Sequence, residues 1–120
     1  AELVAALTDA AAVQPFRERL ADVQAARSWL HSQDWVQKDR ISLLGWSNGA
    51  IAALWAVRPR AAPTDNLPDF RAAAVLYPGC RRRGESAWSA RIPTIILIGA
   101  ADTWTLARDC EQMVAGARQS

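Results

Sequence analysis

The sequence predicts an α/β domain in which a mainly parallel sheet is flanked by helices. Three observations support this prediction. Apolar segments of strand length alternate with longer segments whose apolar residues recur every three or four positions. Glycine and proline punctuate the connections between them. One strand-length segment is apolar throughout, which is typical of a strand buried on both faces of a parallel sheet. We expect a single domain over residues 1–120.

The first half of the chain predicts a helix, a strand and a second helix, over residues 15–33, 40–45 and 50–57. The Ala-rich residues 2–12 could be a short helix or the tail of one. Pro15 is tolerated in the first turn of its helix, and Arg27 is the one residue that breaks that helix's apolar face. The last of these helices ends before Pro59, because the residue that precedes a proline disfavours helical geometry.

The second half predicts two strands and a closing helix, over residues 72–77, 94–98 and 106–116. The strand at 94–98 is the continuously apolar segment, so we expect both of its faces to be buried. Gly116 is placed to end the last helix. Residues 59–69 and 80–91 read as connections, and the basic triplet at 81–83 reads as a solvated part of a loop.

Composition excludes several function classes. Fourteen basic and twelve acidic residues give a net charge of +2, which offers no electrostatic case for nucleic acid or an anionic membrane surface. No apolar run approaches the roughly 20 residues that span a bilayer. One histidine and two cysteines do not predict a metal site. No signal peptide is visible, so we expect a soluble protein, cytoplasmic in the first instance, with a periplasmic or secreted location left open.

The segment with catalytic potential is the pentapeptide Gly-Trp-Ser-Asn-Gly at residues 45–49, which has the pattern G-x-S-x-G. It follows an apolar strand and opens a helix, as a nucleophile elbow does. In such an elbow Ser47 is lifted clear of the sheet, and Gly45 and Gly49 let strand and helix approach closely. The Asn48 N–H can then donate to an oxyanion. The alternative is an ordinary strand-to-helix turn; the glycine motifs of nucleotide-binding loops are absent.

A serine nucleophile needs a base and an acid that orients the base. Asp102 follows the strand at 94–98, so it is expected at the same sheet edge as Ser47. Its alternative role is to start the next helix. The only histidine, His31, ends the helix that feeds the strand before Ser47. It should therefore lie about 20 Å away, at the opposite edge, as a surface residue rather than the base.

Two further pairs of residues are candidates for roles near this edge. Trp46 and Trp104 neighbour Ser47 and Asp102, and they could wall an apolar pocket or pack in the core. Cys80 and Cys110 both follow strands, so they could form a disulfide or remain separate thiols.

Residues 38–49, Lys-Asp-Arg-Ile-Ser-Leu-Leu-Gly-Trp-Ser-Asn-Gly, resemble the elbow region of α/β-hydrolases, and specifically of the dienelactone hydrolase family. Residues 70–80 and 93–105 resemble later segments of that family. The resemblance implies Ser47 as nucleophile, Asp102 as triad acid and the Asn48 amide as oxyanion donor. It also implies a partial fold, with the N-terminal strands missing before residue 1 and the catalytic histidine expected after Ser120.

The resemblance implies a serine hydrolase that acts on a carboxylic ester or lactone by acyl transfer and needs no cofactor. The family's namesake enzymes have cysteine where this chain has Ser47, which favours a general esterase over dienelactone as substrate. Residues 1–120 by themselves are expected to be inactive for want of the base. A serine peptidase of the prolyl oligopeptidase type is an alternative, as is a non-catalytic α/β scaffold or binding domain. The sequence does not indicate an oligomeric state.

Overall fold

The computed structural model of the chain describes residues 17–81 and 87–119. Its sheet has three parallel strands in the order β1-β2-β3, which are Leu43–Trp46, Ala73–Leu76 and Thr94–Leu97. The helices are α2 (Glu18–His31), α3 (Asn48–Ala56) and α4 (Ala107–Gln119), with a short 3₁₀ turn, η1, at Pro59–Ala61. The element order and the parallel pairing confirm the predicted α/β class.

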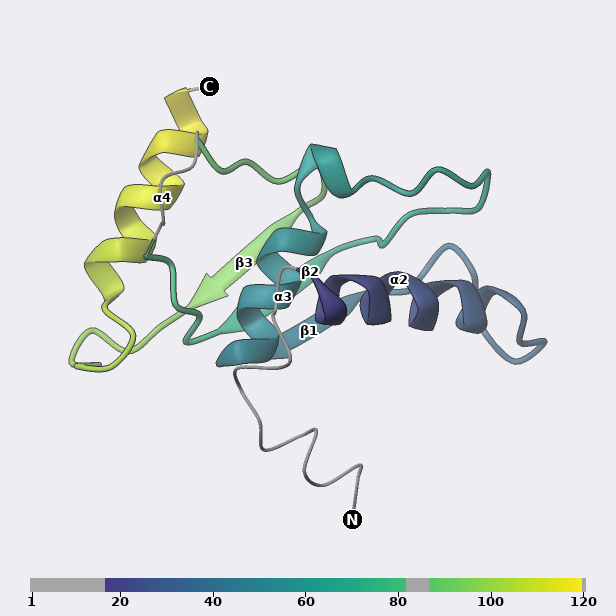
Figure 1. Cartoon of the computed structure of the whole chain (residues 1–120), viewed down its shortest axis with the longest axis horizontal. Helices are drawn as coiled ribbons and strands as arrows, with labels where there is room; N and C mark the ends of the chain where they lie inside the picture. Colours follow the sequence, from purple (N-terminus) through teal and green to yellow (C-terminus); the bar gives the residue numbers. More distant parts are fainter. Residues whose placement is uncertain (1–16, 82–86, 120) are drawn as a thin grey trace, which may run out of the picture.

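The helices are layered on one face of the sheet. In Figure 1, α3 crosses the sheet with α2 and α4 to either side of it. Helix α3 packs on β1 and β2, and α2 packs on α3. The core between α3 and the sheet also takes in the start of α4; its buried members are Ala50, Ala53, Leu54, Val75, Cys80, Cys110 and Met113. Small alanines on α3 let the helix lie close to the strands.

The opposite face of the sheet is apolar and exposed among the described residues. Strand side chains alternate between faces, and the register aligns Leu44 with Ile95 and Trp46 with Leu97 across β2. All four side chains are at least half exposed. The expectation that both faces of the strand at 94–98 are buried is therefore wrong for this structure. A continuously apolar strand can be buried on both faces only if a layer of helices covers each face of the sheet. Here the described helices cover one face.

Helix boundaries also differ from the predictions, and the largest differences concern the start of α3 and the end of α4. Helix α3 begins at Asn48, two residues before the predicted start, so it follows Ser47 directly. Helix α4 runs through Gly116 to Gln119. A single internal glycine costs a helix only about 1 kcal/mol, so it need not end one. The helix expected over residues 2–12 lies outside the described residues.

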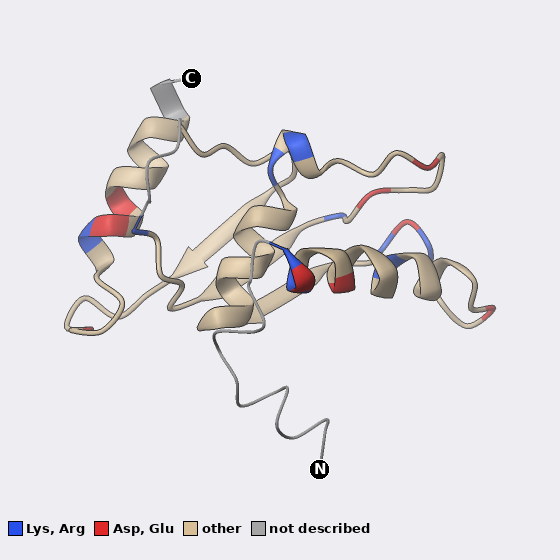
Figure 2. Cartoon of the chain, in the orientation of Figure 1, with Lys and Arg blue, Asp and Glu red and all other residues tan. Residues whose placement is uncertain are grey.

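Charged side chains lie on the helices and the connections, and the strands carry none (Figure 2). No helix in the described part of the chain has both the length and the apolarity to cross a membrane. Because the three strands are parallel, their carboxyl ends lie at the same edge of this uncharged sheet. This edge carries the candidate site.

Candidate active site

Ser47 lies in the sharp turn between β1 and α3 with a backbone conformation that few non-glycine residues adopt. Its φ is 54° and its ψ is −122°. Such a conformation costs on the order of 1–3 kcal/mol and is found most often at functional sites. Ser47 is exposed, and its side chain does not cap the helix that follows. The hydroxyl is therefore free to serve another purpose.

The backbone on both sides of Ser47 holds this turn in place. The Ser47 N–H donates to the Leu76 carbonyl of β2 at 3.1 Å, and the Ser47 carbonyl accepts from the N–H of Ile51 at 3.2 Å. Gly45 makes the close approach possible, because a Cβ there would stand 2.5 Å from the carbonyl oxygen of Gly49. Gly49 has no such need, since a Cβ at that position would meet nothing within 4 Å. Of the two elbow glycines, only Gly45 is sterically required.

The first turn of α3 presents unpaired N–H groups beside Ser47. The first N–H groups of a helix have no intrahelical acceptor, and α3 starts at Asn48 with no side-chain cap. The positive end of the helix dipole adds to these donors. The Asn48 amide is thus next to the Ser47 hydroxyl in sequence and at a helix end suited to negative charge.

Tyr77 shares the edge with Ser47, and the sequence analysis did not identify it. The register pairs Trp46 with Leu76 and Leu76 with Leu97, so the next residues in each strand also lie side by side. Tyr77 follows Leu76, is 42% exposed and has a φ of 38°. Its N–H donates to the Leu97 carbonyl at 2.7 Å. The available signal was a polar aromatic residue at the end of the strand that neighbours the elbow.

Asp102 lies in the connection that leads to α4 from β3, the strand that pairs with β2. Its Oδ1 accepts the N–H groups of Trp104 and Thr105, each at 2.8 Å, and its Oδ2 accepts the Thr105 hydroxyl at 2.8 Å. The backbone N–H of Thr105, followed by its hydroxyl and the N–H of Trp104, lowers the pKa of Asp102. An ionised carboxylate offers about four acceptor positions, so roughly one stays open.

His31 lies at the other edge of the sheet. It is buried at the end of α2, and its Nε2 is 2.9 Å from the Pro68 carbonyl oxygen. A carbonyl only accepts, so Nε2 carries the proton. Pro68 precedes β2, whereas Ser47 follows β1, and the two strands are parallel. The expected placement away from Ser47 agrees with this arrangement, but the expectation of a surface histidine is wrong, because the loop at 65–68 covers the ring.

The same loop is held by Arg27, the residue that interrupts the apolar face of α2. Arg27 is 2% exposed and binds both carboxylate oxygens of Asp65, at 2.9 and 2.8 Å. It also donates to the carbonyls of Leu67 and Pro68. The hydrogen bond from Arg27 is the largest cause that lowers the pKa of Asp65, to about 2. The apparent break in the helix pattern is therefore a structural anchor.

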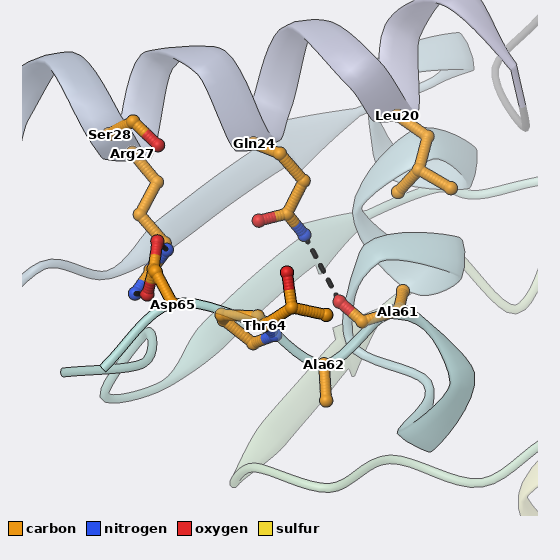
Figure 3. A pocket seen from close by; sticks show the side chains of 9 residues that line it. Leu20, Gln24, Arg27, Ser28, Ala61, Ala62, Thr64 and Asp65 are labelled. Atoms are coloured by element: carbon orange, nitrogen blue, oxygen red, sulfur yellow. Dashed lines mark hydrogen bonds and ion pairs between the residues drawn. The ribbon is translucent and has the colours of Figure 1, made fainter. Parts of the chain in front are cut away.

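A cavity of about 280 Å³ lies between α2 and the segment that carries Asp65. Figure 3 shows Arg27 and Asp65 at one end of it, with Gln24 donating to the Ala61 carbonyl across it. Ser47 does not line this cavity. The cavity is lined by the segment that precedes β2, so it is separate from the sheet edge that holds the elbow.

The two tryptophans beside the candidate residues are not core residues. Trp46 is 57% exposed and Trp104 is 94% exposed. Neither lines the cavity beside Arg27. Their exposure removes the core-packing alternative and leaves both near the elbow edge.

Cys80 and Cys110 are joined in a disulfide, with an S–S distance of 2.08 Å. The bond links the segment after β2 to the first turn of α4. In residues 17–81 and 87–119, no group of three or more His, Cys, Asp or Glu side chains is arranged to hold a metal ion.

In a comparison with known protein families, the model of the prolyl oligopeptidase family matches residues 5–74, which is more than half of the chain. The matched region contains the elbow and ends before Asp102. No curated protein and no solved structure matches the chain.

Proposed function

The chain belongs to the prolyl oligopeptidase family and is a serine hydrolase of the α/β-hydrolase type, and from this premise we propose that Ser47 is its nucleophile. The observation that carries the proposal is the Ser47 backbone, with φ 54° and ψ −122°, in an exposed turn between a strand and a helix. Backbone strain of this kind clusters at active sites. The elbow lies within the region that matches the family.

In the proposed reaction the Ser47 Oγ attacks a substrate carbonyl and forms a tetrahedral intermediate. The Asn48 N–H, at the start of α3, donates to the oxyanion. One such donor is worth about 10²–10³ in rate. Asp102, kept ionised by the hydrogen bonds from Thr105 and Trp104, orients the base and stabilises its charged form. No cofactor takes part in this chemistry.

The described residues do not provide the base. His31 is the only histidine of the chain, and it donates to the Pro68 carbonyl at the opposite sheet edge. We propose that a histidine from outside residues 1–120 completes the triad and donates its Nδ1–H to the open acceptor position of Asp102. Without it, Ser47 reacts slowly, because an unassisted serine hydroxyl is a weak nucleophile.

Two classes of substrate suit this chemistry, and they differ in the leaving group. A carboxylic ester or lactone is supported by the resemblance of residues 38–49 to the dienelactone hydrolase elbow. A peptide bond is supported by the family match over residues 5–74. Exposed Trp46 and Trp104 offer apolar contact to either substrate.

The test is covalent labelling with a fluorophosphonate, with imidazole added as a soluble base. We expect the label on Ser47 by peptide mapping, faster with imidazole, and lost in Ser47→Ala. Ser42→Ala is the matched control, since Ser42 is an exposed serine of the same segment. A label that persists in Ser47→Ala, or its complete absence under all conditions, would argue for the non-catalytic alternative. Rates on p-nitrophenyl acetate and on a prolyl peptide anilide then separate the two substrate classes.

A further inference from the structure

The Cys80–Cys110 disulfide fastens α4 to the rest of the domain. Cys80 follows β2, and Cys110 lies in the first turn of α4, 30 residues later. Both residues are buried in the core. Of the described α4 side chains, only Cys110 and Met113 reach that core as buried residues. The covalent bond therefore supplies a large share of what holds α4 in place.

A cavity of about 350 Å³ lies directly beside this bond. It is lined by Cys80 and Arg81 on one side and by α4 on the other, through Asp109, Gln112, Met113 and Gly116. The packing of α4 against the segment after β2 is thus incomplete where the disulfide joins them. A cavity of this volume can admit a small organic thiol.

The two cysteines differ in their position beside the cavity. Cys80 is among the residues that line it and Cys110 is not, so we take Cys80 as the residue that an entering thiolate attacks. The leaving sulfur is then that of Cys110, in the first turn of a helix. Attack at Cys80 therefore sets the direction of exchange across the bond.

We propose that Cys80–Cys110 is a thiol-exchange site, opened by a dithiol that enters this cavity, and that opening releases α4 and the Asp102 segment from the sheet. A thiolate of the dithiol bonds to the Cys80 Sγ, and the S–S bond breaks to leave the Cys110 thiolate, which takes a proton. The second thiol of the dithiol then attacks the dithiol sulfur that is bonded to Cys80. This breaks the mixed disulfide and frees Cys80 as a thiol. The protein gains two electrons and two protons, and the dithiol leaves as a cyclic disulfide.

The release matters for the site because Asp102 precedes α4 by a few residues. Its carboxylate is held by Trp104 and Thr105, and the chain continues from Thr105 into α4 at Ala107. Movement of a released α4 would therefore displace the segment that carries Asp102. A reduced protein would lose the fixed position of this carboxylate, and this regulatory consequence rests on the proposed role of Asp102.

The route of exchange is tested by filling the cavity. Gly116→Leu adds a side chain on the cavity wall, where a Cβ meets nothing within 4 Å. We expect reduction by dithiothreitol, followed by intact mass, to slow by about tenfold or more. Gly116→Ala is the matched control, because alanine and leucine have similar helix propensity while alanine leaves the cavity open. Equal rates in the two variants would overturn entry through the cavity.

The release of α4 is tested by hydrogen exchange on the oxidised and reduced chain. We expect amides of α4 and of residues 99–106 to lose protection by about tenfold or more on reduction, while β1 and α3 keep theirs. The double variant Cys80→Ala, Cys110→Ala should match the reduced protein. Uniform loss of protection, or none, would overturn the proposal. These measurements do not depend on catalysis. The proposal for the disulfide can therefore hold when labelling of Ser47 fails, and it can fail when Ser47 is labelled.

Discussion

At the scale of single residues, Ser47 is the most informative position. It takes a conformation with φ 54° although it has a Cβ, and hydrogen bonds from both neighbouring elements hold it there. A nucleophile gains from such a turn, because the side chain projects away from the sheet while the next amides point toward the same region. The strain is thus tied to the placement of one hydroxyl group.

The backbone strain predicts an order of stability between two variants that both lack the hydroxyl. Ser47→Gly should have a free energy of unfolding about 1 kcal/mol higher than Ser47→Ala, because glycine adopts positive φ without a steric penalty. Urea denaturation of the two variants measures the difference. An alanine variant as stable as the glycine variant would show that the turn relaxes.

Asp102 illustrates how a carboxylate can be oriented without burial. Three donors from Trp104 and Thr105 fix its plane and lower its pKa. These bonds fit the helix-start alternative as well as the triad role, because a loop that leads into a helix uses the same donors. The proposed role therefore depends on the base that reaches the remaining lone pair.

At the scale of elements, the junction of β1 and α3 depends on one close backbone contact. A Cβ on Gly45 would lie 2.5 Å from the Gly49 oxygen, a distance that requires the helix or the strand to move. The neighbouring Gly49 has open space on its own Cβ side. The same motif thus holds one glycine that is needed for packing and one that is not.

This contrast predicts opposite effects of the same substitution. Gly45→Ala should lower the free energy of unfolding by about 2–3 kcal/mol through the clash. Gly49→Ala should leave it unchanged or raise it by up to about 1 kcal/mol, since alanine favours helix. Thermal denaturation of both variants under one set of conditions makes the comparison. Similar losses in both would mean that the approach is looser than the structure shows.

The contact between α2 and the loop before β2 rests on Arg27. Its guanidinium is buried, while its partner Asp65 keeps 37% of its side chain exposed. Loss of the arginine leaves a carboxylate that water can partly solvate, so the cost falls below that of a fully buried pair.

Arg27→Met should therefore lower the free energy of unfolding by about 2–3 kcal/mol. Arg17→Met is the matched control, because Arg17 directly precedes the same helix and its side chain is 68% exposed. Its Nη2 lies 3.6 Å from the Oε1 of Glu18, which is also exposed. Its effect should stay within about 0.5 kcal/mol. Chemical denaturation measures both, and a small effect of Arg27→Met would mean that the loop is held by other contacts.

At the scale of the whole molecule, the two edges of the sheet, at the amino and carboxyl ends of its parallel strands, differ in the contacts that stabilise them. The edge that precedes the strands is tied by two bidentate pairs, Arg27 with Asp65 and Arg91 with Asp69. The edge that follows the strands carries Ser47, Tyr77 and Asp102. Ion pairs thus concentrate away from the candidate site.

These pairs predict how the stability of the whole chain depends on pH. Asp65 has a pKa of about 2 against its usual 3.8, and the pKa of Asp69 is also lowered, mainly by its hydrogen bonds with Arg91. A lowered pKa stabilises the fold above the unfolded value, so stability should be lost as pH falls from about 4 toward 2. Asp65→Asn should flatten this dependence, and Asp39→Asn, an exposed control, should not. Denaturant midpoints between pH 2 and 6 supply the measurement.

The sequence by itself determined the features that local pattern specifies. Apolar spacing predicts the strand and helix order, and G-x-S-x-G between a strand and a helix predicts an elbow at Ser47. The same patterns placed Asp102 after the third strand. Each of these inferences uses residues only a few positions apart, which is the range over which propensity and periodicity act.

Only the tertiary structure decided which distant residues meet. Asp65 is 38 positions from Arg27, so nothing in the helix pattern revealed that the charge on its apolar face is paired. Burial of His31 depends on a loop that folds back over it, and the place of Tyr77 beside Ser47 depends on strand register. Exposure of one sheet face likewise reflects which layers are present. These properties follow from long-range contacts, and local sequence does not encode them separately.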